Sequence, residues 1–172
     1  MDIQELAISG VLLIQPKIWS DDRGFFMEVY HQESFINKGV STSFVQDNLS
    51  FSKKGVIRGL HFQRPPRAQA KLVRCVRGSV FDVAADVDPT SGTYGQHVSA
   101  ILSEENHAML FIPGKYAHGF CVVSDAVVEY KMDALYAPEF AGGVRYNDPA
   151  LAIEWPEQNP ILSKQDKQWP YL

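Results

Sequence analysis

The sequence has 172 residues and a formal net charge of −4, and 45% of its residues are hydrophobic. A chain of this length can bury a substantial core as one domain without disulfides, and this composition excludes a disordered protein. A mildly acidic chain also lacks the basic field that non-specific nucleic-acid binding requires, so we expect one globular domain over residues 1–172 that does not bind nucleic acid.

Short apolar runs separated by turn-forming residues predict an all-β protein. In chain order we expect strands at 11–14 and 25–30, a short helix at 33–37, strands at 43–48 and 56–62, a hairpin at 71–87, and strands at 97–102, 108–112, 119–123 and 127–135. Many short strands favour a double-sheet jelly roll, a cupin-like β-barrel, because sheet packed on sheet covers most edge strands. We therefore expect little helix and a ligand site in the barrel.

The hairpin and the C-terminal segment are predicted from local turn chemistry. Residues 71–76 and 79–87 lie on either side of Arg77 and Gly78, and Gly78 can adopt the positive φ that a tight turn needs. After Tyr136 the pattern changes, and repeated prolines predict an irregular segment that wraps around the body of the protein: Pro138, Pro149, Pro156, Pro160 and Pro170.

The N-terminus and the cysteines indicate a compartment. Asp2 and Glu5 stand where a signal peptide would carry positive charge, and no apolar run is long enough to cross a membrane. Cys75 and Cys121 are isolated and lack metal-ligand spacing, which is typical of buried thiols in a reducing compartment. We expect a cytoplasmic protein that does not bind a membrane.

Arg58 and His61 stand inside an otherwise apolar strand segment. Burying them requires compensation, which an anionic ligand for Arg58 and a proton-transfer role for His61 would supply. The alternative is an edge strand with two polar side chains that face solvent. Residues three apart on a regular strand face opposite sides, so both can line one pocket only if the strand is irregular. We expect a bulge or irregular backbone at Gly59.

Three other side chains could take part in chemistry, and each also has an ordinary structural explanation. His118 enters an apolar strand after a turn, where a lone histidine is more often structural. Tyr130 ends an apolar strand, where aromatic residues usually pack, but a phenol that faces a pocket could transfer a proton. Asp166 follows Ser163 by three residues, a spacing that fits either a helix capping box or a carboxylate that orients a histidine.

A metal-binding cupin is disfavoured by the spacing of the histidines. Such sites usually combine two histidines one residue apart with a carboxylate and a later histidine, and the sequence contains no His-x-His pair. We interpret the histidines near turns and strand ends as surface residues: His31, His97 and His107.

The order and separation of these motifs resemble the dTDP-4-dehydrorhamnose 3,5-epimerase family over nearly the whole chain. The similar segments are 22–28, 44–48, 58–63, 71–74, 111–113, 117–120, 130–131, 136–138, 147–149 and 162–166. Four residues depart from those that are usual in the family and leave the sugar preference open: Phe62, Asp133, Ala141 and Tyr146.

The resemblance implies a homodimeric epimerase that inverts C3 and C5 of a dTDP-linked 4-keto-6-deoxy sugar without a metal or redox cofactor. It implies that His61 is the base, Asp166 orients it, Tyr130 is the acid on the opposite face and Lys71 stabilises the enolate oxygen. The residues implied to bind substrate are Arg58, Gln46, Asn48, His118 and Tyr136, with Arg23, Phe26 and Glu28 completing the nucleotide site of a neighbouring subunit.

Two other functions stay open at this point. The first is an epimerase that inverts only C3 of a related dTDP-4-keto-deoxysugar, using the same residues. The second is a non-catalytic jelly roll that binds nucleotide sugars. The coexistence of His61, Lys71, Tyr130 and Asp166 argues against the second, because binding alone needs no acid–base pair.

Overall fold

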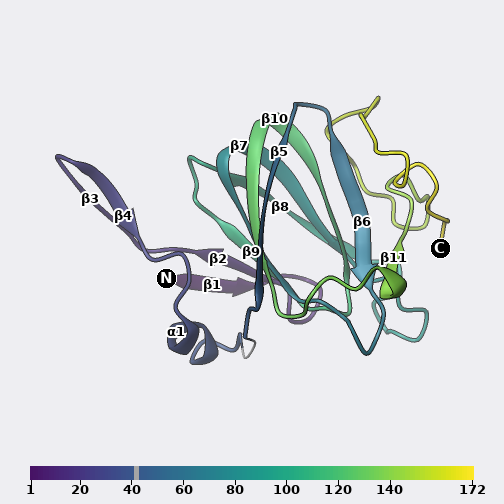
Figure 1. Ribbon diagram of the computed structural model, residues 1–172, viewed down its shortest axis with the longest axis horizontal. Coiled ribbons are helices and arrows are strands. Elements are labelled where there is room, and N and C mark those ends of the chain that lie inside the picture. The colour runs from purple at the N-terminus through teal and green to yellow at the C-terminus, as the bar shows by residue number, and fades with distance from the viewer. Residues whose placement is uncertain (41–42) are drawn as a thin grey trace.

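The computed structural model describes residues 1–40 and 43–172, and almost all of its regular structure is β-strand (Figure 1). The described elements are β1 (Asp2–Glu5), β2 (Leu12–Gln15), β3 (Ile18–Asp21), β4 (Gly24–Met27), α1 (Gln32–Ile36), β5 (Gln46–Ser52), β6 (Ile57–Gln63), β7 (Lys71–Ala85), β8 (His97–Ser103), β9 (Met109–Ile112), β10 (Ala117–Met132), the 3₁₀ helix η1 (Pro138–Phe140) and β11 (Ala141–Gly143). The all-β prediction is confirmed. Strands β1, β3 and β11 were not predicted from the sequence.

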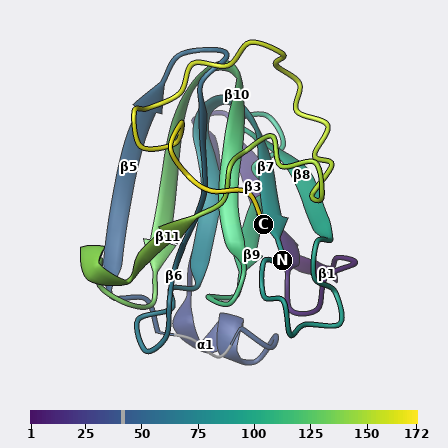
Figure 2. The same cartoon turned by 90° about the vertical axis from the view of Figure 1, so that its right-hand side faces the viewer.

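Nine of the described strands form one sheet, in the order β1–β2–β9–β7–β10–β6–β11, with β5 added on β10 and β8 added on β7. Strand β7 pairs with β9 through residues 71–74 and with β8 through 79–85. Strand β10 pairs with β5 through 126–132 and with β6 through 118–121. Both long strands therefore change neighbours along their length, and the sheet folds into two facing halves, the β5 half and the β6 half, as a jelly roll does (Figure 2).

The predicted hairpin at 71–87 is wrong. Residues Lys71–Ala85 form the single strand β7, which bends at Gly78, where φ is +77°. A Cβ atom on Gly78 would lie 2.2 Å from the carbonyl oxygen of Asp125, so the glycine permits the close approach of β10 to the bend. The strands predicted at 119–123 and 127–135 are likewise one strand, β10, whose register with β7 shifts around Ser124.

A hydrophobic core fills the space between the two halves of the sheet. Most of its buried members come from β7, β8, β9 and β10, and these include Val73, Val80, Leu102, Leu110, Phe120 and Val128. Residues 144–172 contain neither helix nor strand apart from an isolated bridge between Val56 and Ile161, and they lie beside β6 and β11 (Figure 1). In the part of the chain that the structure describes, no helix is both long and apolar enough to span a membrane.

Candidate active site

A pocket of about 360 Å³ opens between the two halves of the sheet and the C-terminal segment. Strands β6 and β10 supply much of its lining, β7 and β11 add Lys71, Ala141 and Gly142, and residues 163–169 close one side. The sequence-predicted site residues that line it are Arg58, His61, Lys71, His118, Tyr130, Tyr136 and Asp166. The pocket therefore brings together the whole proposed acid–base set, although its members are far apart in the sequence.

His61 and Asp166 form a hydrogen-bonded pair on one wall. The Nε2 atom of His61 lies 2.5 Å from Oδ1 of Asp166, and the histidine side chain is 42% exposed whereas the carboxylate is only 4% exposed. Ser163 Oγ also accepts a hydrogen bond from the backbone N–H of Asp166, at 3.0 Å. No helix forms at residues 163–168, so the Ser163–Asp166 bond closes a turn rather than a helix cap, and this turn presents the Asp166 carboxylate to His61.

The pairing keeps Asp166 ionised. Burial alone would raise the pKa of this carboxyl, but the hydrogen bond and charge interaction with His61, together with hydrogen bonds from Ser163 and Trp169, hold the pKa below its ordinary value. An ionised carboxylate fixes the orientation of the ring and stabilises the imidazolium that forms when the ring takes up a proton.

Strand β6 is irregular at Gly59, as predicted. His61 pairs with His118 and Arg58 pairs with Phe120, so three steps along β6 match two steps along β10. This extra residue is a bulge, and φ of Gly59 is +133°. A Cβ atom at Gly59 would lie 2.5 Å from the Cα atom of Gly119. Because of the bulge, Arg58 and His61 both line the pocket, and the prediction is confirmed.

Tyr130 comes from the other half of the sheet, where it pairs with Asn48 of β5 and Val73 of β7. Burial raises the pKa of the Tyr130 phenol, and the positive charge of Arg58 opposes that rise only in part. The phenol therefore stays protonated at neutral pH and can donate a proton. His61 belongs to the β6 half and Tyr130 to the β5 half, so a ring bound between the two halves has an imidazole on one side and a phenol on the other.

Lys71 is buried in the same pocket at the start of β7. Burial lowers its pKa to about 8, against the opposing influence of the negative charges of Asp82 and Asp133. An ammonium group that is only weakly hydrated can stabilise negative charge on a bound ligand strongly, because little water competes for it.

His118 is held by a carboxylate that the sequence analysis missed. Its Nε2 lies 3.0 and 3.1 Å from the two carboxylate oxygens of Asp82, which is fully buried. An acidic residue within an otherwise apolar strand is the signal that could have found it, the same signal that identified Arg58 and His61.

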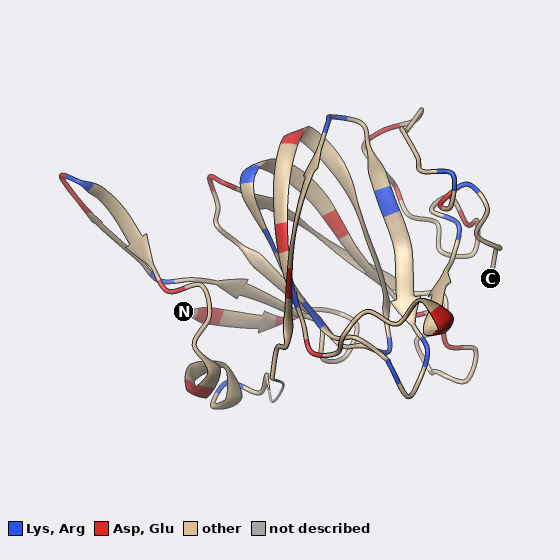
Figure 3. Ribbon diagram, viewed as in Figure 1, with Lys and Arg blue, Asp and Glu red and all other residues tan. Residues whose placement is uncertain are grey.

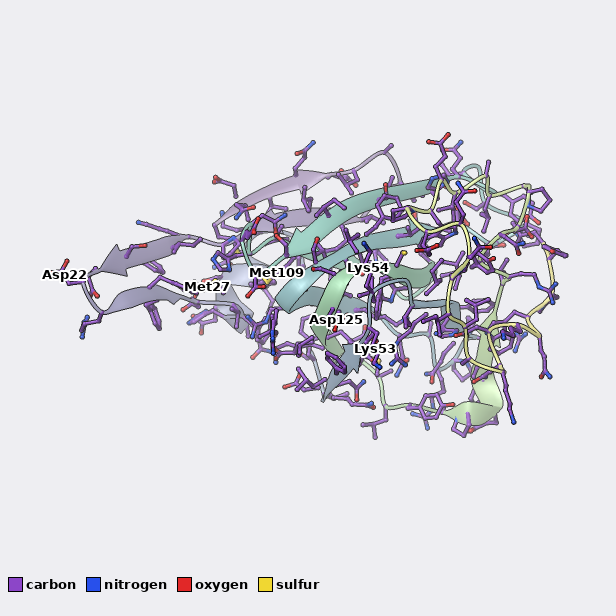
Figure 4. The ribbon with its side chains drawn as sticks, turned by 90° about the horizontal axis from the view of Figure 1, so that it is seen from above. Asp22, Met27, Lys53, Lys54, Met109 and Asp125 are labelled. Atoms are coloured by element: carbon purple, nitrogen blue, oxygen red, sulfur yellow. The ribbon has the colours of Figure 1, made fainter. Side chains whose placement is uncertain are left out.

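Five predicted substrate-binding residues lie outside the pocket lining. Two of them contact a residue that does line the pocket or contact each other: Gln46 accepts a hydrogen bond of 3.0 Å from the backbone N–H of Tyr136 and donates one of 3.1 Å to Asn48. The others, Arg23, Phe26 and Glu28, belong to or follow the β3–β4 hairpin, which projects away from the body with Asp22 near its tip (Figures 1 and 4). They do not reach the pocket of their own chain.

In residues 1–40 and 43–172, no cluster of three or more His, Cys, Asp or Glu side chains could hold a metal ion. Acidic and basic residues are distributed along the described chain and do not gather in one element (Figure 3).

The fold and the pocket define a jelly-roll protein with one interior site. An imidazole–carboxylate pair lies on one wall of this site, and a phenol lies on the facing wall. A sequence profile described as dTDP-4-dehydrorhamnose 3,5-epimerase matches residues 5–172, and the chain belongs to that family.

Three similar proteins illustrate the relationship. A dTDP-4-dehydrorhamnose 3,5-epimerase of Shigella flexneri is 49% identical over 168 residues, which cover 96% of this chain and 93% of that protein. A crystal structure of a dTDP-6-deoxy-D-glucose-3,5-epimerase from Legionella pneumophila Philadelphia 1, in complex with dTDP-4-keto-L-rhamnose, has a TM-score of 0.95 and 43% identity and covers 99% of this chain and 92% of that one. A dTDP-4-dehydrorhamnose 3-epimerase of Streptomyces niveus is 40% identical, over 97% of this chain and 82% of that protein.

Proposed function

We propose that this protein is an isomerase that inverts C3 and C5 of dTDP-4-dehydro-6-deoxy-glucose and so forms dTDP-4-dehydro-L-rhamnose. One observation carries the proposal: His61, paired with Asp166, and Tyr130 line the same pocket from the two facing halves of the sheet. Inversion of a carbon by proton transfer needs a base on one face of the ring and an acid on the other. The reaction only moves protons, so it is redox-neutral.

The mechanism follows from the positions of four side chains. The C4 ketone acidifies the hydrogens on C3 and C5, and His61 removes one of them as a proton while the electron pair moves onto the carbonyl oxygen. Lys71 stabilises the resulting enolate oxygen through its ammonium charge. Tyr130 then donates its phenolic proton to the carbon from the opposite face, and exchange of protons with water restores His61 and Tyr130.

Substrate binding is assigned to the remaining polar groups of the pocket. Arg58 is suited to bidentate contact with the diphosphate, and its orientation is set by a hydrogen bond of 2.9 Å from Nε to Ser52 Oγ. His118, fixed by Asp82, and Tyr136 contact the sugar end. A volume of about 360 Å³ accommodates a sugar ring, so the nucleotide extends beyond the pocket of a single chain.

We further propose that the neighbouring subunit of a homodimer completes the nucleotide site. The β3–β4 hairpin packs against little of its own chain, and two strands alone are only marginally stable in water. The hairpin also exposes Trp19, Phe25 and Phe26, the last by 68%. A second group of exposed apolar residues consists of Leu49 and Phe51 on the edge strand β5 and Val45 just before it. Exposed apolar surfaces of this kind mark protein interfaces.

Equilibrium sedimentation is expected to give twice the 19.3 kDa chain mass. Phe26→Ala is expected to raise the KM for the dTDP-sugar by about tenfold or more, because a buried aromatic contact contributes on the order of 2 kcal/mol at an interface. Ile101→Ala, which alters an exposed apolar residue of β8, serves as the control and leaves KM unchanged. Sedimentation of the wild-type protein as a monomer would contradict the subunit proposal, and so would a wild-type KM in the Phe26→Ala variant.

We also propose a domain organisation and a cellular location for this protein. Residues 1–172 act as one jelly-roll domain, and the protein works in the cytoplasm. The free, buried thiols of Cys75 and Cys121 support a reducing compartment.

The test of the function is turnover of dTDP-4-dehydro-6-deoxy-glucose in deuterated water, followed by NMR. Deuterium at both C3 and C5 of the product is the expected result. Inversion at C3 alone remains the second candidate, because the Streptomyces niveus relative is named a 3-epimerase. Deuterium at C3 only would select that candidate, and dTDP-sugar binding without any exchange would reject both.

A further inference from the structure

Trp169 lies beside the catalytic pair that we propose. It follows Asp166 by three residues, lines the same pocket, and packs edge-on against His61 with ring centroids 6.1 Å apart. The indole also rests on Gly143, where a Cβ atom would lie 2.4 Å from Trp169 Cε2. Gly143 is the residue of β11 that pairs with His61 in the sheet. Because Gly143 has no side chain, the indole of Trp169 occupies the space beside the backbone that pairs with His61.

The segment that carries Trp169 is anchored on both sides of the indole. Arg145 donates a hydrogen bond from Nη2 to the carbonyl oxygen of Lys167, at 2.5 Å, and from its backbone N–H to the carbonyl oxygen of Pro170, at 2.9 Å. These bonds to the backbone tie residues 167–170 to the chain just beyond β11. Trp169 therefore has a fixed place in the pocket wall.

The indole N–H of Trp169 is buried and forms no hydrogen bond of full geometry among the described residues, although it lies close enough to the Asp166 carboxyl to lower the pKa of that group. A buried donor without a partner is costly, and such groups are rare in folded proteins. Trp155 provides the contrast, because its indole N–H donates to the carbonyl oxygen of Tyr146 at 2.7 Å. Since His61 is bonded to Oδ1 of Asp166, Oδ2 is left as an acceptor on the side of the carboxylate away from that bond.

We infer that Trp169 is a positioning residue whose indole N–H serves Asp166 as a second hydrogen-bond donor, keeping the carboxylate aligned with His61 during proton transfer. The interaction is present in the free protein and shortens when substrate fills the pocket, since catalytic hydrogen bonds commonly tighten in the complex. This role rests on the proposed function of the His61–Asp166 pair. The direction of the carboxyl pKa agrees with it: burial raises the pKa of Asp166, whereas His61, Ser163 and Trp169 together lower it below its ordinary value.

The other charged and titratable groups around Asp166 are known and stay constant in the test. They are Arg58 and His61 from β6, Lys71 from β7, His118 and Tyr130 from β10, Tyr136 before η1, Arg145 and Tyr146 from the chain after β11, and Lys167 from its own segment. A change in the titration of Asp166 after substitution of Trp169 alone therefore reports the lost donor.

Trp169→Phe removes the N–H and retains an aromatic ring over Gly143, and Trp155→Phe is the matched control that loses a paired indole N–H elsewhere. The pKa of Asp166, measured from its side-chain carboxyl ¹³C shift against pH, is expected to rise in Trp169→Phe and to stay at the wild-type value in Trp155→Phe. In Trp169→Phe, kcat is expected to fall by about tenfold, with KM within about twofold of wild type, because only alignment is lost.

An unchanged Asp166 titration in Trp169→Phe would overturn the inference, as would an equal rise in Trp155→Phe. The wild-type protein offers the same test without a substitution. The indole ¹H–¹⁵N resonance of Trp169 is expected to shift with the titration of Asp166, whereas that of Trp155 does not, and a Trp169 resonance that ignores Asp166 would also overturn it. Neither NMR titration depends on turnover, so failure of the epimerase assignment is recognised separately.

Discussion

Replacing His61 with alanine is expected to lower deuterium exchange at C3 and C5 of dTDP-4-dehydro-6-deoxy-glucose by about 10²- to 10⁴-fold, the usual contribution of a positioned general base. The physical reason is that the substitution removes the imidazole and leaves only the Asp166 carboxylate, which is buried in the same wall and is a weaker base. Exchange is measured by NMR of the recovered sugar nucleotide in deuterated water.

His97→Ala is the matched control, because His97 lies at the start of β8 and does not line the pocket. It should leave exchange at the wild-type rate. Exchange that survives His61→Ala undiminished would show that another group removes the proton, and the assignment of the base would have to be abandoned.

Lys71→Met is expected to lower kcat by about 10²- to 10³-fold, which is the typical cost of removing one preorganised group that stabilises an oxyanion. The same substitution should raise the free energy of unfolding at pH 7, by on the order of 1–3 kcal/mol, because burial that lowers a lysine pKa to about 8 destabilises the fold while the amine is charged. Activity and chemical denaturation of one preparation measure both effects. Lys54→Met, at an exposed lysine, should change neither.

The pH dependence of the Lys71 contribution follows from the direction of its pKa. The unfolded state binds more protons than the folded state between pH 8 and the ordinary lysine pKa of 10.5, so stability rises with pH across that window. Activity is expected to fall as the pH rises through 8, because the Lys71 ammonium loses its proton and its charge there. Lys71→Arg, in which the guanidinium keeps its charge, is expected to move the alkaline limb of kcat to higher pH. An unmoved limb would mean that another group sets it.

The sequence predicted the fold class because turn chemistry is local, but it could not place every bend. A glycine with positive φ suits either a tight hairpin turn or a bend in a continuous strand. At Gly78 the outcome depends on the approach of Asp125, which is distant in sequence. Strands β8 and β9 then occupy the two parts of β7 that a hairpin would have folded onto each other.

The site was predictable where a residue conflicted with its surroundings and unpredictable where it did not. Arg58 and His61 in an apolar strand required an irregular backbone, and Gly59 was the available place for it. Spacing alone could not join His61 to Asp166, because 105 residues separate them, and family resemblance supplied that pairing. Nothing in the local sequence indicated a functional role for Trp169, since an aromatic residue in a proline-rich segment usually packs against the body of the protein.

The arrangement of His61 and Tyr130 on facing walls makes a stereochemical prediction, and Tyr130→Phe tests it most directly. With the base intact and the acid removed, NMR of the nucleotide sugar recovered from deuterated water should show deuterium at C3 with the original configuration retained and inverted product strongly reduced. Inverted product formed at the wild-type rate by Tyr130→Phe would contradict the account, because protonation of the far face would then not need the phenol.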